Sequence, residues 1–162
     1  MYRFNFKLRT AEELNDDRVL KYLEFNLIHC ETENLINIAN PIVESVEQID
    51  WFIENENLIL SAEVPFSLEE CESVAVGMKE IYDKIDLDDE ELLDRISEFR
   101  FSHAIRMAFR GQDLPDIFIA KGNNNYEVSC SEDNIEFCYQ VEIVSLFEEI
   151  KSIKADYINQ IV

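Results

Sequence analysis

Apolar and polar residues alternate in two short stretches near the start of the chain. Every second position is apolar between residues 3 and 8, and the same period of two returns between residues 23 and 27. Successive side chains of a β-strand point to opposite faces of its sheet, so this period is typical of a strand buried on one face. The pattern therefore predicts two half-buried strands, whose apolar residues are Phe4, Phe6, Leu8, Leu23, Phe25 and Leu27.

Four positions carry an oxygen-bearing side chain that is followed three residues later by Glu or Gln, the capping-box pattern of a helix start. They are Ser45 with Gln48, Ser67 with Glu70, Asp88 with Glu91, and Ser145 with Glu148. After Ser67 and after Ser145, apolar residues recur at spacings of three and four, which predicts an amphipathic helix in each place. The two apolar stripes comprise Leu68, Cys71, Ala75, Met78, Tyr82 and Ile85, and then Leu146, Ile150, Ile153, Tyr157 and Ile161.

The other two helix starts lead into less regular patterns. The residues after Ser45 fit the periods of both a helix and a strand, and we expect a helix followed by a strand over residues 58–60. We expect the helix from Asp88 to end at Gly111, because glycine readily adopts the left-handed conformation found at helix C-termini. Its apolar face shifts near Phe99, which predicts a kink or two separate helices.

Three runs typical of β-strands lie between residues 117 and 139, separated by the polar connectors 122–125 and 131–134. Asn and Gly tolerate positive φ, so these connectors predict hairpin turns and an antiparallel meander. No linker rich in Pro, Gly or Ser divides the 162 residues, a length that suits one domain. We therefore expect a single α+β domain, residues 1–162, in which an antiparallel sheet with a C-terminal three-strand meander packs against three to four helices.

The composition narrows the possible functions. The chain has 35 Asp and Glu against 14 Lys and Arg, a formal net charge of −21, and 47% of its residues are apolar. The apolar share predicts a folded protein rather than an acidic disordered tail. Proteins that bind nucleic acid or anionic membranes use clustered cations, so we expect neither activity. Gly77, Gly111 and Gly122 lie too far apart to form a glycine-rich phosphate-binding motif.

Cysteine usage and the N-terminal pattern point to the cytoplasm. The N-terminal residues lack the continuous apolar stretch of a signal peptide, and no run approaches the roughly 18 apolar residues that span a membrane. The four cysteines have no C-x-x-C spacing and only two histidines are present, so we expect no metal, no cofactor and reduced, mostly buried thiols. Cys130 and Cys138 remain candidates to face each other across the second hairpin.

The negative charge is concentrated in two stretches. Residues 22–78 contain twelve acids and no Lys or Arg, and residues 86–98 contain seven acids and one Arg. Such runs often only keep a protein soluble. They also repel one another in the compact state and accelerate association with basic proteins. We therefore expect a non-catalytic acidic inhibitor, an immunity protein or antitoxin that binds and blocks a basic nuclease-type toxin.

The candidate partner-binding residues are acids of the two stretches together with the single tryptophan. Tryptophan is enriched in interface hot spots, although one that lies between two isoleucines is also a common core residue. The set comprises Glu44, Glu47, Asp50, Trp51, Glu54, Glu56, Asp86, Asp88, Asp89, Glu90, Glu91 and Asp94.

Two alternative functions remain open. One is a protein that mimics the charge of DNA and so inhibits a nucleic-acid-binding enzyme. The other is a small enzyme or accessory domain that binds an anion through Arg100, His103, Arg106 and Arg110, which share about one third of the circumference of the expected helix. We expect these cations mainly to pair with the chain's own carboxylates. Neither histidine belongs to a known catalytic motif, so we assign no catalytic residue.

Overall fold

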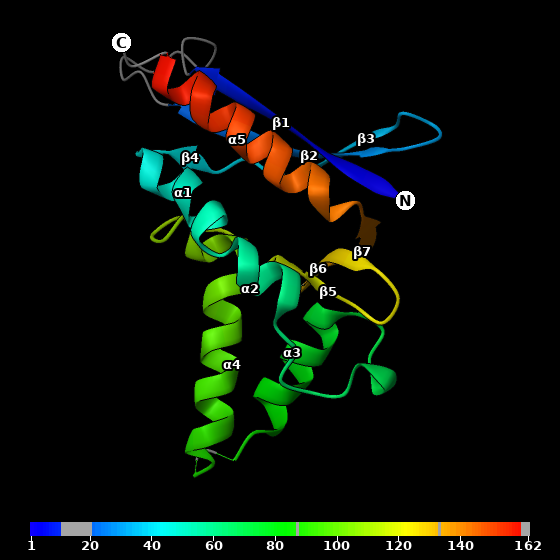
Figure 1. Ribbon diagram of the computed structural model, residues 1–162. Coiled ribbons are helices and arrows are strands. Elements are labelled where there is room, and N and C mark those ends of the chain that lie inside the picture. The colour runs from blue at the N-terminus through cyan, green and yellow to red at the C-terminus, as the bar shows by residue number, and fades with distance from the viewer. Residues whose placement is uncertain (11–20, 87, 133, 160–162) are drawn as a thin grey trace. The chain divides into compact units, whose positions relative to one another are not determined.

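A computed structural model describes residues 1–10, 21–86, 88–132 and 134–159 (Figure 1). The chain forms two compact units. Unit 1 comprises Met1–Glu54, Ala108–Leu114 and Val141–Val162, and unit 2 comprises Asn55–Met107 and Pro115–Gln140. That one domain spans residues 1–162 stays a prediction.

The protein is α+β, as predicted, and its described strands form a mixed seven-stranded sheet with the order β3-β2-β1-β7-β6-β5 and with β4 paired to β2. The expectation of a wholly antiparallel sheet is wrong in one place, because β1 and β7 are parallel, with Tyr2 opposite Val141. Short turns make strands antiparallel, but these two strands lie near opposite ends of the chain and no turn joins them. The strands are β1 (Tyr2–Thr10), β2 (Lys21–His29), β3 (Leu35–Ala39), β4 (Ile42–Val43), β5 (Phe118–Lys121), β6 (Tyr126–Glu132) and β7 (Ile135–Val141).

The helices agree with the sequence pattern in part. They are α1 (Val46–Glu54), α2 (Glu56–Ser61), α3 (Val74–Lys84), α4 (Glu90–His103) and α5 (Ile143–Asn159), with short 3-10 helices η2 (Leu68–Glu70) and η3 (Ile105–Met107). Residues 58–60, expected as a strand, belong to α2. The long helix expected to end at Gly111 ends at His103, although Gly111 has the expected positive φ of 89°. Ile161 of the predicted C-terminal stripe lies outside the described residues.

In unit 1, α5 packs along β1 and against α1 (Figure 1). The backbone amides of Phe4 and Phe6 donate to side chains of α5, namely Ser145 Oγ at 2.9 Å and Glu149 Oε2 at 2.7 Å. Unpaired strand amides are a route to aggregation, and α5 covers these two. Ser145, expected to cap a helix, instead lies within the first turn of α5, where its hydroxyl donates to the carbonyl oxygen of Glu142.

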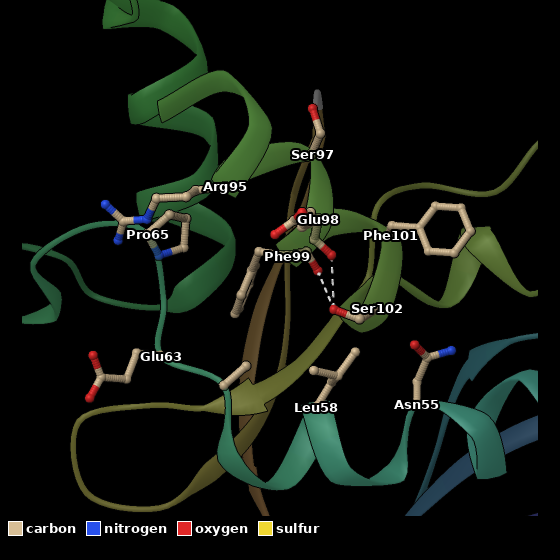
Figure 2. Close-up of a pocket in the computed structure, with 11 residues that line it drawn as sticks. Asn55, Leu58, Glu63, Pro65, Arg95, Ser97, Glu98, Phe99, Phe101 and Ser102 are labelled. Carbon is tan, nitrogen blue, oxygen red and sulfur yellow. Dashed lines mark hydrogen bonds between the residues drawn. The ribbon is translucent and has the colours of Figure 1, made fainter. Parts of the chain in front are cut away.

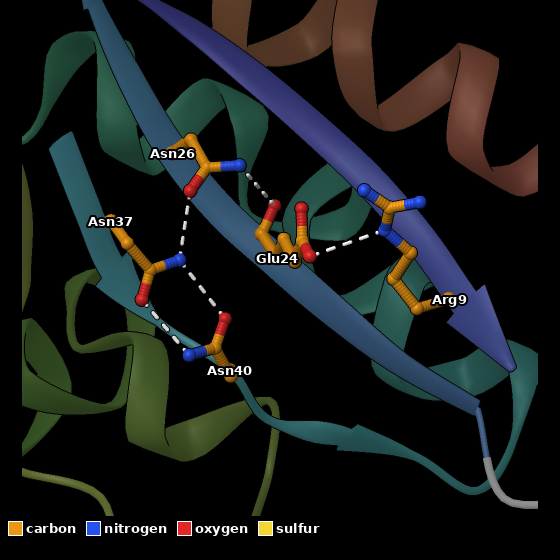
Figure 3. Close-up of polar contacts among 5 residues, drawn as sticks. All are labelled: Arg9, Glu24, Asn26, Asn37 and Asn40. Carbon is orange, nitrogen blue, oxygen red and sulfur yellow. Dashed lines mark hydrogen bonds and ion pairs between the residues drawn. The ribbon is translucent and has the colours of Figure 1, made fainter. Parts of the chain in front are cut away.

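The strict alternation of β2 breaks at Asn26, which is buried beside two apolar neighbours. The register between β2 and β3 shifts at this position. Figure 3 shows how the buried amide is satisfied: Asn37 donates to Asn26 Oδ1 at 2.7 Å, and Asn37 and Asn40 exchange two hydrogen bonds at 2.9 Å. A buried amide costs little when it is bonded in this way, so the network allows a polar residue inside the sheet.

In unit 2, α3 packs on β5 and β6, and α4 packs on β5 and α2. The first three backbone amides of α3 each donate a hydrogen bond to a side-chain oxygen. Val74 N donates to Glu127 Oε1 at 2.7 Å, Ala75 N to Ser129 Oγ at 3.1 Å and Val76 N to Ser73 Oγ at 3.2 Å. The sequence pattern placed this helix start at Ser67, but two acceptors come from β6, which is distant in sequence. Ser67 precedes η2 instead.

Candidate functional site

Six acidic residues gather at the start of α4 in unit 2, and we call them the α4 acidic cluster. All six are exposed: Asp86, Asp88, Asp89, Glu90, Glu91 and Asp94. In the part of the chain that the structure describes, no Lys or Arg forms an ion pair with any of them. All six belong to the second acidic stretch of the sequence, and no described cation compensates their charge at the surface.

Local folding explains part of this cluster. Asp89 is the N-cap of α4, and its Oδ1 accepts from the backbone amide of Leu92 at 3.1 Å. Glu90 and Glu91 lie in the first turn, where the helix dipole favours negative charge. Asp94 lies beyond the first turn. The dipole effect fades within that turn, so it does not account for Asp94.

The other predicted acidic residues lie elsewhere. Glu44, Glu47 and Glu54 are exposed in unit 1, and a hydrogen bond with Ser45 lowers the pKa of Glu47. Glu56 begins α2 in unit 2. The twelve predicted residues therefore do not form one group within a single unit.

Two members of the predicted set are engaged inside unit 1. Asp50 Oδ1 pairs with Lys154 Nζ at 2.5 Å, which neutralises its charge locally. Trp51 is only 7% exposed, and its ring meets Phe52 edge-on with ring centroids 4.9 Å apart. The indole is thus a core group and offers little area to a partner. Of the two interpretations of this tryptophan, interface residue or core residue, the structure agrees with the core residue.

The four residues of the alternative anion site do not share one helix. Because α4 ends at His103, Arg106 lies in η3, and Arg110 lies in a segment of unit 1. Arg100 donates from Nε to Asp116 Oδ2 at 2.6 Å and from Nη2 to Asp116 Oδ1 at 3.2 Å. This bond with Asp116 raises the pKa of Arg100. Arg106 Nη1 lies 4.0 Å from Asp116 Oδ1. Asp116 therefore pairs with both Arg100 and Arg106, as expected for cations that pair with the chain's own carboxylates.

His103 is a core residue, with 1% of its surface exposed. Its Nδ1 lies 2.8 Å from Ser102 Oγ and 3.0 Å from the carbonyl oxygen of Phe99, and its ring stacks on Phe99 at 4.0 Å. Burial lowers the pKa of His103 to about 4, against the opposing effect of the Phe99 and Leu58 backbone. The imidazole is neutral at pH 7 and carries no charge for an anion.

The residue pattern does not predict a pocket of about 610 Å³ between α2 and α4 in unit 2. Figure 2 shows Leu58 on α2 pointing toward Ser102 on α4. The apolar part of the lining comprises Leu58, Ala62, Pro65, Phe99 and Phe101. Leu58 is 48% exposed and Phe101 is 50% exposed, so two large apolar side chains of the pocket are open to solvent. The sequence feature that lies nearest to this pocket is the shift of the apolar face of α4 at Phe99.

Charged side chains stand around this pocket, namely Glu63, Arg95 and Glu98 (Figure 2). The hydroxyl of Ser102, which also lines the pocket, donates to the carbonyl oxygen of Glu98 at 2.9 Å. The backbone of α4 therefore already engages this hydroxyl. The pocket combines an apolar lining with a charged rim, an arrangement common in binding sites.

Among the described residues, no group of three or more His, Cys, Asp and Glu side chains is placed to hold a metal ion, and no helix is long and apolar enough to cross a membrane. All four cysteines are free thiols. Cys130 is buried, but Cys30 and Cys138 are exposed, so the expectation of mostly buried thiols is wrong.

Comparison with known proteins identifies no relative of this chain. The chain matches no protein-family model, no curated protein and no solved structure.

Proposed function

We propose that this protein is a non-catalytic acidic inhibitor in the cytoplasm, an immunity protein or antitoxin that binds and blocks a basic nuclease-type toxin. The observation that carries this proposal is the α4 acidic cluster, whose six carboxylates are exposed and form no ion pair with the described cations.

The charge of unit 2 supports the proposal. The sequence of unit 2 contains 19 Asp and Glu and 6 Lys and Arg, which gives a formal charge of −13. Two carboxylates a few ångströms apart repel by about 1 kcal/mol even in bulk water, so an unpaired cluster costs stability. A basic partner would convert this repulsion into attraction and raise the association rate by about 10- to 1000-fold.

A nuclease is the kind of basic protein that fits this cluster. It binds a polyanion, so its cleft concentrates Lys and Arg at the spacing of phosphates. Carboxylates in successive turns of one helix can contact several of these cations at once. They would then exclude the nucleic acid from the cleft without any chemistry by the inhibitor.

The test begins with capture of the partner. Tagged protein is incubated at low salt with lysate of its source cell, eluted in salt steps, and the eluted proteins are identified by mass spectrometry. The nuclease activity of the eluted protein is then assayed with and without the inhibitor. We expect one basic protein that leaves only at high salt and whose nuclease activity falls when the inhibitor is added.

Charge reversal tests whether the α4 acidic cluster is the surface that inhibits the partner. Asp88→Lys with Asp94→Lys spares the N-cap Asp89 and should weaken inhibition at least about tenfold, because it removes steering by the cluster. The matched control is Glu148→Lys with Asp156→Lys, which changes the net charge equally at exposed positions of α5. Equal inhibition by both variants would contradict the proposal. Capture of a host nucleic-acid-binding enzyme that has no nuclease activity would favour a DNA mimic instead.

A further inference from the structure

The pocket between α2 and α4 shares a helix with the α4 acidic cluster. Residues 90–94 of α4 carry acids of the cluster, and residues 95–102 of the same helix contribute to the pocket lining. A helix rises about 1.5 Å per residue, so Asp94 and Phe99 lie only about 7 to 8 Å apart along the axis. A single segment of a partner can therefore contact both features at once.

The open apolar side chains of this pocket call for an explanation. Leu58 and Phe101, both about half exposed, come from different helices yet line the same hollow. Large apolar groups gathered at a concave surface typically mark a binding site. The pocket volume of about 610 Å³ lies within the usual range for binding sites and leaves room for more than one side chain.

The rim indicates what kind of segment fits. Glu63 and Glu98 stand at the pocket, and Asp94 lies one helical turn before Glu98. Cations placed next to an apolar side chain would pair with these carboxylates. Arg95 is the one cation among the described residues that line the pocket, against Glu63 and Glu98, so the local charge at the rim is negative.

We propose that this pocket receives apolar side chains, such as Leu, Met or Phe, from a segment of the basic partner that is also rich in Lys or Arg. An amphipathic helix presents such anchors at spacings of three and four residues, with its cations beside them. The proposal rests on the proposed function and deepens it, because the acidic cluster attracts the partner and the pocket fixes its position.

Two labelled peptides test the pocket even before the partner is identified. The first is a short amphipathic peptide of Lys and Leu, and the second has the same lysines with every Leu replaced by Ala. Fluorescence anisotropy gives the Kd of each peptide at about 50 mM and about 300 mM salt. We expect the Lys/Leu peptide to bind at least about tenfold more tightly, because burial of one leucine suffices for that factor.

Two pocket variants and one control locate the binding. Leu58→Gln removes an apolar wall, and Ser97→Trp fills the pocket from an exposed position of α4. Each variant should remove most of the difference in Kd by which the Lys/Leu peptide binds more tightly than the Lys/Ala peptide. Val144→Gln, at an exposed apolar residue of α5 in unit 1, should leave the advantage intact. Circular dichroism confirms that each variant is folded, which is expected because the altered side chains are exposed.

The outcomes separate the two proposals. Equal binding of the two peptides, or an advantage that survives both pocket variants, overturns the pocket inference and leaves the electrostatic proposal standing. Binding of the Lys/Ala peptide that does not change with salt or with Asp88→Lys and Asp94→Lys overturns the proposed function as well. Loss of the advantage in both pocket variants, with the control unaffected, supports the inference.

Discussion

Acid should destabilise unit 2 through one buried side chain, His103. In the native protein burial lowers the pKa of His103 from 6.5 to about 4, whereas in the unfolded chain the imidazole is hydrated and has its ordinary pKa. The unfolded state therefore binds a proton first as the pH falls. The stability contributed by the neutral imidazole is complete above pH 6.5 and is lost between pH 6.5 and about pH 4.

The magnitude follows from the shift. One pKa unit corresponds to about 1.4 kcal/mol, so a fall from 6.5 to about 4 amounts to about 3 kcal/mol. A domain has a total stability of about 5 to 15 kcal/mol, so this loss is large enough to measure. The pKa falls rather than rises because His103 is only 1% exposed and burial is the largest cause of the shift.

Urea unfolding between pH 7.5 and pH 4 measures the effect. His103→Phe keeps a ring that can stack on Phe99 and removes the titrating group. It removes the polar contacts of Nδ1 with Ser102 Oγ and the carbonyl oxygen of Phe99, so we expect it to be less stable than wild type at pH 7. On acidification the wild type should lose about 3 kcal/mol relative to this variant.

The chain's many carboxylates also titrate in this range, but they are common to all variants and cancel in the difference. His29→Gln serves as the control, because His29 is the other histidine of the chain and lies at the end of β2 in unit 1. Unfolding of this variant over the same pH range shows whether removal of a histidine elsewhere in the chain produces the same change as His103→Phe. A constant difference in unfolding free energy between wild type and His103→Phe across this pH range would refute the reasoning.

Two further predictions concern unit 2. Glu127→Ala removes the acceptor for the amide of Val74, and we expect it to lower the unfolding free energy by about 1 to 2 kcal/mol in urea, whereas Glu127→Gln, which keeps an acceptor oxygen, should cost less; equal losses would argue against the capping role. Arg100→Ala leaves the carboxylate of Asp116 without its two closest hydrogen bonds and should cost about 1 to 3 kcal/mol, with partial recovery when Asp116→Asn is added. Additive losses in that double-mutant cycle would show that the two residues do not interact.

Elements with regular periods could be predicted from the sequence. The alternating residues of β1 and β2 and the described part of the apolar stripe of α5 each face a core in the structure, and β5, β6 and β7 are neighbours in the sheet, as the predicted meander requires. The second predicted connector is too long, because Ser131 and Glu132 belong to β6. These elements depend on local spacing, which the sequence shows directly. The parallel contact of β1 with β7 depends on long-range packing, and no local pattern indicates it.

The incorrect boundaries have physical causes of the same kind. Residues 58–60 have the composition of a strand, but they form α2, which packs against α4 and β5. α4 ends at His103 because Ala104 adopts an extended conformation and bridges to Phe118 of β5. Tertiary packing overrides local propensity in both places.

In the candidate site too, features that depend on local sequence could be predicted and features that depend on tertiary packing could not. The α4 acidic cluster lies within residues 86–94, so it could be predicted by counting charges along the sequence. The pocket joins Leu58 to residues of α4 some forty positions later, and only the packing of the two helices brings them together. Trp51 lies beside acids in the sequence, yet it is a core residue whose ring packs edge-on against Phe52.

The most direct test of the central claim is the association rate between this protein and the captured basic partner, measured by stopped flow as a function of salt. We predict that the rate falls steeply with salt for the wild type and for the Glu148→Lys, Asp156→Lys control. For Asp88→Lys with Asp94→Lys the rate at low salt should be at least about tenfold lower and should depend less on salt. A rate and salt dependence identical in all three proteins would contradict the claim that the α4 acidic cluster recognises the partner.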